Sequence, residues 1–134
     1  MNDIASLQAL LQPLFPGLLG MELTELSADR VCARLKVRPD LCTVGGTLHG
    51  GAIMAFADTL GAVATFINLP KGVRTTTIES KTNFFAGAPA DTSVTAECIP
   101  FHKGKSTMVW QTQVRNEAGK LSAVVTQTQM ILPV

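Results

Sequence analysis

The sequence predicts an α+β domain in which a curved, mostly antiparallel sheet of about six strands wraps one long central helix. Residues 50–68 are almost all small or apolar, as is typical of a helix buried on every side. After Gly72 the pattern changes to alternation with a period of two, in runs rich in threonine and valine. The 134 residues suffice for one such domain, expected to span residues 1–134.

The first elements follow from capping residues and alternation. Asn2 or Asp3 can cap a short helix that reaches Leu11 and ends before Pro13 and Pro16. A hairpin of residues 20–26 and 30–38 should follow. Its second strand has one apolar face, made of Val31, Ala33, Leu35 and Val37. Residues 39–48, rich in glycine and threonine, are expected to form a loop before the long helix.

Four strands are expected after the long helix, which residues 70–72 should end. They span residues 74–85, 92–99, 105–116 and 121–132. The breaks between them, at residues 87–90, 100–104 and 117–119, are short. Breaks of this length favour an antiparallel meander, in which each strand pairs with the next.

Composition and charge exclude several classes of function. Apolar residues make up 46% of the chain, charged residues 16%, and the formal net charge is +1. Disorder and nucleic-acid binding are therefore not expected. The odd number of cysteines, with no metal-ligand spacing, predicts free thiols and no metal site; they are Cys32, Cys42 and Cys98.

A membrane partner is not expected either. The stretch MNDIASLQALL lacks the positive charge of a signal peptide. Asp58 lies near the middle of residues 50–68, where a charge disfavours membrane insertion. The chain is therefore expected to be cytoplasmic.

Asp58 is the only charged residue between Gly50 and Asn68. An ionised carboxylate in so apolar a segment is costly unless it is paired or has a function, which makes Asp58 a candidate catalytic residue. Gly50 and Gly51 begin the same helix and leave their N–H groups approachable at its positive end. Two such donors aimed at one carbonyl oxygen would form an oxyanion hole.

The spacing of these groups predicts a shared site. Eight residues separate Gly50 from Asp58, or about 12 Å along a helix, which exceeds the attack distance of about 3–3.5 Å. If both groups act on one carbonyl, they come from two subunits whose helices run antiparallel across a two-fold axis. His49, just before the helix, either fixes the loop by a hydrogen bond or acts as an acid or base, of which we favour the first.

The stretch GTLHGG at residues 46–51, with Asp58 nine residues after the histidine, resembles the hotdog-fold acyl-CoA thioesterases. The phenylacetate-pathway type is the most similar, and the resemblance covers nearly the whole chain. It implies a hotdog fold, dimers usually paired into tetramers, and hydrolysis of acyl-CoA without a metal or cofactor, CoA being part of the substrate. It also implies that Asp58 is the nucleophile or the base, that the Gly50 N–H polarises the thioester carbonyl, and that His49 holds the loop.

The resemblance implies further site residues. Thr77 falls where relatives often place a hydroxyl that orients the water, although an ordinary strand threonine is an equal alternative. Relatives commonly have asparagine six residues before the histidine, where this chain has Thr43, which lacks an amide's two donors. Residues 102–106 lie where the family often places nucleotide contacts. The residues expected to bind the substrate or its CoA end are Thr43, Gly51, Lys103, Gly104 and Lys105.

Other residues are weaker candidates. The basic row on the hairpin is a less favoured site for the CoA phosphates; it contains Arg34, Lys36 and Arg38. Three phenylalanines are candidates for the acyl pocket, although such residues usually belong to a core; they are Phe56, Phe84 and Phe85.

The predicted function is hydrolysis of an acyl-CoA whose acyl group is either aryl-acetyl or of medium chain length. A hotdog module that binds acyl-CoA without turnover is the alternative, but such a module would not need an acid at position 58. A hydratase on the same fold would pair a histidine with an acid, and no second motif supplies that pair. The expected partners are acyl-CoA and other copies of the chain, in a homodimer with shared sites that pairs into a homotetramer.

Overall fold

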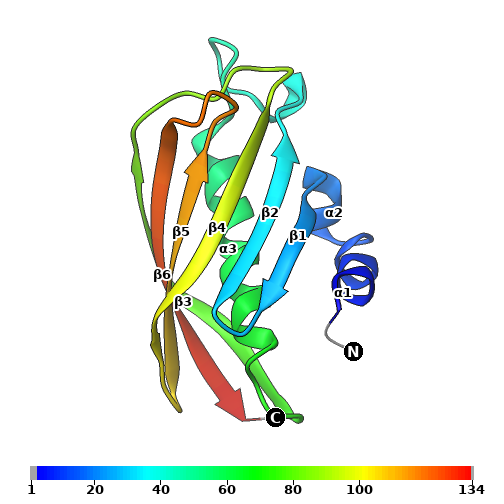
Figure 1. Ribbon diagram of the computed structural model, residues 1–134, viewed down its shortest axis with the longest axis vertical. Helices are drawn as coiled ribbons and strands as arrows, with labels where there is room; N and C mark the ends of the chain where they lie inside the picture. Colours follow the sequence, from blue (N-terminus) through cyan, green and yellow to red (C-terminus); the bar gives the residue numbers. More distant parts are fainter. Residues whose placement is uncertain (1–2, 134) are drawn as a thin grey trace.

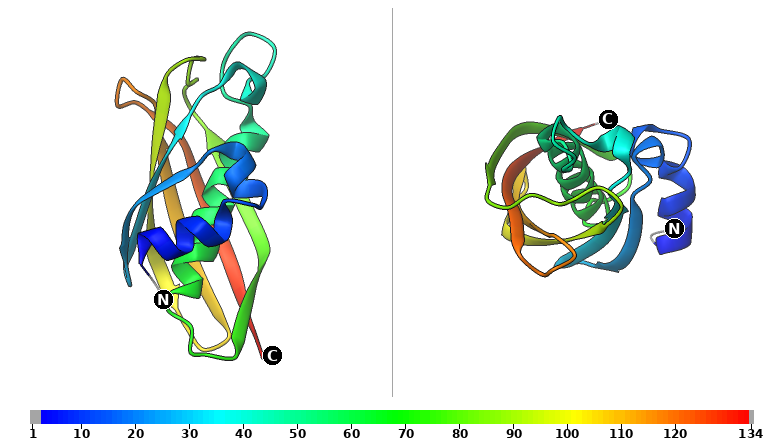
Figure 2. Two further views of the ribbon diagram at one scale, coloured as in Figure 1. Left: turned by 90° about the vertical axis from the view of Figure 1, so that its right-hand side faces the viewer. Right: turned by 90° about the horizontal axis from the view of Figure 1, so that it is seen from above.

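The computed structural model describes residues 3–133. Its longest helix, α3 (Gly50–Phe66), lies on the concave side of a six-stranded sheet that curves around it (Figure 1). Seen along the helix, the strands surround much of α3, and the N-terminal helices lie outside the sheet (Figure 2). The predicted architecture of one long helix wrapped by an antiparallel sheet is confirmed.

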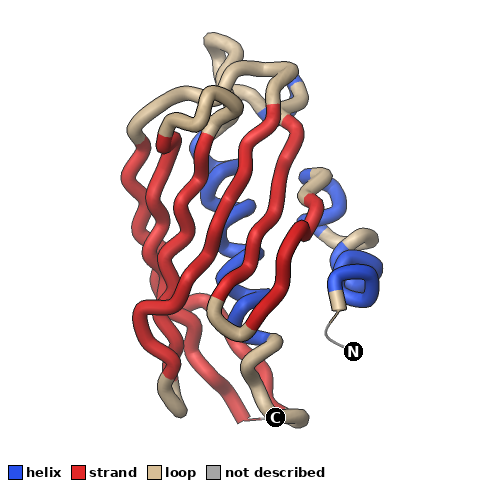
Figure 3. Tube along the Cα trace, viewed as in Figure 1, coloured by secondary structure: helices blue, strands red, loops and turns tan. Residues whose placement is uncertain are grey.

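The remaining elements are short helices and long strands (Figure 3). The helices are α1 (Ile4–Leu11), α2 (Phe15–Leu19) and the 3₁₀ turn η1 (Pro39–Leu41). The strands are β1 (Glu22–Ser27), β2 (Arg30–Lys36), β3 (Val73–Phe84), β4 (Ser93–Lys103), β5 (Thr107–Arg115) and β6 (Leu121–Pro133). Their order in the sheet is β1-β2-β4-β5-β6-β3, and every neighbouring pair is antiparallel.

The predicted meander is correct for β4, β5 and β6 but wrong for β3. β3 pairs with β6, whereas β4 pairs with β2. The reason lies in α3, which connects β2 to β3 and packs against sheet on both of its flanks. β2 and β3 therefore lie on opposite sides of the helix, and β4, β5 and β6 fill the sheet between them. The link of residues 85–92 can span about 26 Å when extended, enough to cross to the far side. The length of a loop limits how far the next strand can lie, but it does not determine which strand that next strand pairs with.

The helix predicted to reach Leu11 ends there, before Pro13 and Pro16, so this boundary is confirmed. A second helix was not expected: Pro16 lies in the first turn of α2, where a missing N–H is tolerated. Pro100 does not end β4, because a β-bulge between Pro100 and His102 lets the strand continue to Lys103. The turn to β5 is therefore only residues 104–106.

The predicted cap and alternation are confirmed. The Asp3 carboxylate accepts a 2.7 Å hydrogen bond from the Ser6 N–H, which lowers the pKa of Asp3. The predicted apolar face packs into the core: Val31, Ala33 and Leu35 of β2 are buried, as is Val37 directly after the strand.

The C-terminal half of α3 is fixed against β5 by Trp110, whose side chain is completely buried. The indole Nε1 donates to Thr65 Oγ1 at 2.8 Å, and that hydroxyl donates to the Gly61 carbonyl at 2.9 Å. A buried donor and a buried hydroxyl thus satisfy each other. This contact fixes the position of α3 along β5.

Within residues 3–133, no helix is long and apolar enough to cross a membrane. The His, Cys, Asp and Glu side chains of the same range form no group of three or more that could hold a metal ion. All three cysteines are free, and burial raises the pKa of Cys98 to about 12.

Replacing Thr65 by valine should lower the free energy of unfolding by about 1–3 kcal/mol, because the Trp110 N–H would be left buried without an acceptor. Urea unfolding followed by the fluorescence of Trp110, the single tryptophan, measures this change. Thr59→Val is the matched control, since Thr59 makes the same bond to the carbonyl four residues back but meets no tryptophan. Equal losses in the two variants would contradict the prediction.

Candidate functional site

Asp58 is half-buried on α3, where the helix faces β3 and β6. Its Oδ1 accepts from Thr77 Oγ1 at 2.6 Å and from Gln127 Nε2 at 3.2 Å. Gln127 Nε2 also lies 3.3 Å from the Asp58 carbonyl oxygen. No lysine or arginine within residues 3–133 forms an ion pair with Asp58, so two neutral donors anchor the carboxylate.

The two oxygens of this carboxylate are not equivalent. Both hydrogen bonds go to Oδ1, and no residue of the described chain donates to Oδ2. One oxygen is therefore held in place while the other is available to an incoming group. A fixed carboxylate with one available oxygen can act as a nucleophile or as a general base.

Gln127 reaches Asp58 because position 61 is glycine. A Cβ added to Gly61 would lie 2.3 Å from both Cδ and Nε2 of Gln127, far inside normal contact distance. Glycine within a helix is less stable than alanine by about 1 kcal/mol, and here it makes room for an amide that is only 1% exposed. A small residue of α3 thus makes room for the polar side chain of Gln127, in addition to letting the sheet pack closely on the helix.

A second buried amide lies behind Thr77. Gln129 Nε2 donates to Thr77 Oγ1 at 2.6 Å, and Gln129 Oε1 accepts from Thr75 Oγ1 at 2.9 Å. Neither glutamine was expected from the sequence. The available signal was their position, since both fall on the alternation of β6 that Ala123 and Val125 mark as buried.

His49 caps α3 through its side chain. His49 Nδ1 accepts a 2.7 Å hydrogen bond from the Gly51 N–H, so the structure agrees with the expected loop-fixing role. The same bond corrects the expectation of two free donors, because the N–H of Gly51 is already used. The Gly50 N–H has no hydrogen-bond partner within residues 3–133 and is the donor that remains.

A pocket of about 330 Å³ opens beside Gly50. Phe84 and Phe85 form part of its wall, and a Cβ at Gly50 would lie 3.1 Å from the ring of Phe84. Phe56, the third phenylalanine considered for a pocket, is completely buried in the core, which corrects that expectation. It belongs to the buried hydrophobic cluster and does not line this pocket.

A second pocket, of about 310 Å³, lies between α1, α3 and β3. Its wall is mainly apolar and includes Leu7, Leu10, Leu11, Ala62, Val63 and Phe66. Thr59 and Thr75 also line it. Thr59 follows Asp58 on α3, and Thr75 lies two residues before Thr77 on β3. Asp58 and Thr77 do not line the pocket themselves; because residues two apart on a strand are about 7 Å apart, its wall at Thr75 lies about that far from Thr77.

Gly50 and Asp58 are too far apart to act together within one chain. α3 is continuous from Gly50 to Phe66, so the eight-residue step from Gly50 to Asp58 is about 12 Å along the helix. The structure therefore has the predicted distance along α3 between the Gly50 N–H and the Asp58 carboxylate within one chain.

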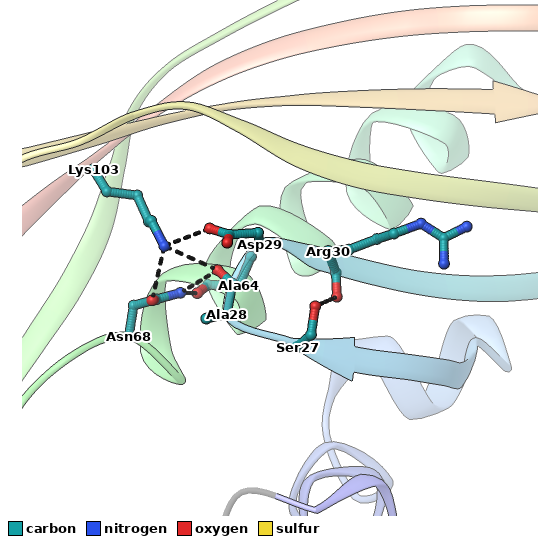
Figure 4. A network of polar contacts seen from close by, with 7 residues as sticks. All are labelled: Ser27, Ala28, Asp29, Arg30, Ala64, Asn68 and Lys103. Atoms are coloured by element: carbon teal, nitrogen blue, oxygen red, sulfur yellow. Dashed lines mark hydrogen bonds and ion pairs between the residues drawn. The ribbon is translucent and has the colours of Figure 1, made fainter.

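The basic turn after β4 lies at the other end of α3 from Gly50. Lys103 Nζ is 2.5 Å from Asp29 Oδ1 and 3.5 Å from Asn68 Oδ1, which joins the turn to the β1–β2 hairpin and to the end of the helix (Figure 4). The Gly104 N–H closes the turn on the Thr107 carbonyl. Within one chain, Lys103 has a structural partner, whereas Lys105 is exposed.

The other candidates have mostly structural contacts. The Thr43 side chain is exposed, and its backbone closes the loop with Thr47 and Gly46. Arg34 pairs with Glu22 at 3.1 Å. Arg38 donates to the carbonyls of residues 18 and 19 at the end of α2.

Comparison with known proteins places this geometry among thioesterases. Residues 45–123 match the family model described as the thioesterase superfamily. The chain is 28% identical over 116 residues to the 1,4-dihydroxy-2-naphthoyl-CoA hydrolase of Escherichia coli, covering 87% of this chain and 85% of that protein. The crystal structure of a thioesterase from Haemophilus influenzae superposes with a TM-score of 0.92 at 27% identity, covering 98% of this chain and 91% of that chain.

The phenylacetate-pathway type finds weaker support. The PaaI protein of the phenylacetic acid degradation operon of Escherichia coli superposes with a TM-score of 0.84, covering 94% of this chain and 90% of that chain. Its identity is 20%, a level at which the likeness concerns the fold alone.

Gly61→Ala should lower the free energy of unfolding by about 1–3 kcal/mol, because the new methyl group overlaps the Gln127 amide. In a Gln127→Ala background the same change should be neutral or stabilising, since the amide is gone and alanine favours a helix. Chemical denaturation of the single variants and the double variant measures both values. An equal loss in the two backgrounds would show that another group excludes the methyl.

Proposed function

This chain belongs to the thioesterase superfamily and is a thioester hydrolase, and we propose that it hydrolyses acyl-CoA to the free acid and CoA. The observation that carries this proposal is the Asp58 carboxylate, anchored through Oδ1 and unpartnered at Oδ2 among the described residues. A non-catalytic acyl-CoA-binding module would gain nothing from a carboxylate held in this way beside an apolar pocket.

The chemistry needs one carboxylate and one backbone donor. The Gly50 N–H, at the positive end of α3, polarises the thioester carbonyl. Oδ2 of Asp58 either takes a proton from the attacking water or bonds directly to the carbonyl carbon. In both routes the C–S bond breaks and the CoA thiolate leaves and takes up a proton; the direct route passes through an anhydride that water then hydrolyses.

Gly50 and Asp58 come from different subunits in this proposal. β3 is an edge of the sheet, twelve residues long, and Ile78 on it is 55% exposed. An exposed edge of this length is suited to pairing with a second copy. A two-fold axis at β3 would set the two α3 helices antiparallel and bring Gly50 of the partner subunit to Asp58. Further pairing of dimers into tetramers follows from the family resemblance alone.

The acyl group would occupy the pocket between α1, α3 and β3. That pocket is mainly apolar, measures about 310 Å³ and has Thr59, the residue after Asp58, in its wall, which suits aryl-acetyl and medium-chain acyl groups. The naphthoyl-CoA named for the relative in Escherichia coli is an aryl thioester, which supports testing aryl groups first. Lys105, exposed near the far end of α3, is the candidate contact for the CoA phosphates.

Asp58→Asn should reduce turnover at least about 100-fold, because the amide neither abstracts a proton nor attacks the carbonyl. Thiol release from a panel of aryl and fatty acyl-CoA substrates measures the rate and identifies the acyl class. Unfolding and size-exclusion measurements confirm that the variant remains folded and assembled. A variant with the wild-type rate would make Asp58 structural. Calorimetric binding of acyl-CoA without turnover by the wild type would support the binding module instead.

Gly50→Pro should reduce kcat/KM by about 100-fold to 1000-fold, because it removes the N–H that polarises the carbonyl. Proline is tolerated at the first position of a helix, and His49, with ψ of 137°, already has the conformation preferred before proline. Gly50→Ala is the matched control, since it places a Cβ against Phe84 but keeps the N–H. Equal activity of the two variants would exclude this donor.

Co-expression of the Gly50→Pro and Asp58→Asn chains then tests the shared site. Random dimers would contain intact sites built from Asp58 of one chain and Gly50 of the other, giving about a quarter of the wild-type activity. Activity no higher than that of the separate variants would show that each site belongs to one chain.

A further inference from the structure

We propose that Gln129 is a positioning residue that makes the Thr77 hydroxyl a permanent donor to Asp58. The inference rests on the proposed function, because it concerns how the same carboxylate is held. Gln129 is completely buried and bonds to Thr77 rather than to Asp58, so it acts through Thr77.

The argument begins with the single hydrogen of the Thr77 hydroxyl. Thr77 Oγ1 lies 2.6 Å from Asp58 Oδ1 and 2.6 Å from Gln129 Nε2. An amide nitrogen can only donate, so the Thr77 oxygen must accept from Gln129. Its own hydrogen then has one destination, which is Asp58.

The orientation of the Gln129 amide is itself determined by its neighbours. Its Oε1 accepts from Thr75 Oγ1 at 2.9 Å, which leaves Nε2 facing Thr77; the Thr75 hydroxyl shares its hydrogen with the Met130 carbonyl, 3.0 Å away. With the amide turned end for end, its oxygen, the Thr77 oxygen and Oδ1 of an ionised Asp58 would share one hydrogen. Either the buried Gln129 oxygen would then be unpaired, or Oδ1 of Asp58 would keep Gln127 as its only donor; each arrangement loses a hydrogen bond.

The result is a chain of hydrogen bonds that all run in one direction. Thr75 donates to Gln129, Gln129 donates to Thr77, and Thr77 donates to Asp58. Gln127 adds a second donor to the same oxygen, although its own Oε1 is buried with no partner among the described residues. Oδ1 is thereby reserved as an acceptor, and Oδ2 is left as the reacting oxygen.

A purely structural role for Gln129 makes different predictions from a positioning role. Gln129→Met keeps the size of the side chain but cannot donate a hydrogen bond at any pH. Its kcat should therefore be about tenfold below wild type at every pH, with KM nearly unchanged. In Gln129→Glu, the protonated acid can donate to Thr77, whereas the ionised form only accepts and competes for the hydrogen of Thr77. The kcat of this variant relative to wild type should therefore fall as the pH rises.

Measurement of kcat and KM against pH for both variants tests these expectations. Ser122→Ala is the control for disturbance of β6, because Ser122 is buried on the same strand and its hydroxyl has no hydrogen-bond partner within residues 3–133. A flat kcat ratio for Gln129→Glu, or equal losses for Gln129→Met and Ser122→Ala, would overturn the proposal.

A double-mutant cycle on stability gives a second readout that does not depend on catalysis. The unfolding free energies of Gln129→Met, Asp58→Asn and the double variant should be non-additive, although the two side chains do not bond to each other. Coupling without hydrolysis of any thioester would support the positioning of Asp58 and contradict the proposed function. Hydrolysis with additive energies would overturn the role of Gln129 and leave the proposed function intact.

Discussion

Asp58 carries a charge on a helix that the sheet surrounds, and its Oδ1 is anchored by donors from that sheet. The two donors come from β3 and β6, which are distant in sequence and adjacent in the sheet. The antiparallel register that sets Thr77 opposite Gln129 brings the second amide to the same place. The position of this one carboxylate therefore depends on three features: the pairing of β3 with β6, the glycine at position 61 and the two buried glutamines.

β3 connects the site to the proposed assembly. One side of the strand supplies Thr77 to Asp58, while its outer edge has no neighbouring strand in the sheet. A second copy added to that edge would lie close to the carboxylate and would contribute the donor that lies about 12 Å away along α3 within one chain. Catalysis and association would then depend on the same twelve residues.

The sequence predicted what local patterns determine, and the rest depends on tertiary contacts. Asp58 was recognisable because it is the lone charge in an apolar segment, and His49 and Gly50 because they adjoin the helix start. The neighbour of β3 was not predictable from loop length, and the glutamines remained hidden because their bonds span 52 or more residues. Gly51 was wrongly counted as a free donor because the rotamer of His49 decides which N–H is occupied.

The pocket between α1, α3 and β3 has one wall that belongs neither to the central helix nor to the sheet. α1 supplies Leu7, Leu10 and Leu11 to it; Leu7 is buried in the core and fixes the helix, whereas Leu10 is 58% exposed and can change without opening the core. Mutations in α1 can reshape the cavity while the carboxylate, its donors and the helix start stay as they are. If the acyl group occupies this pocket, a change of acyl preference requires no change in the hydrolytic groups.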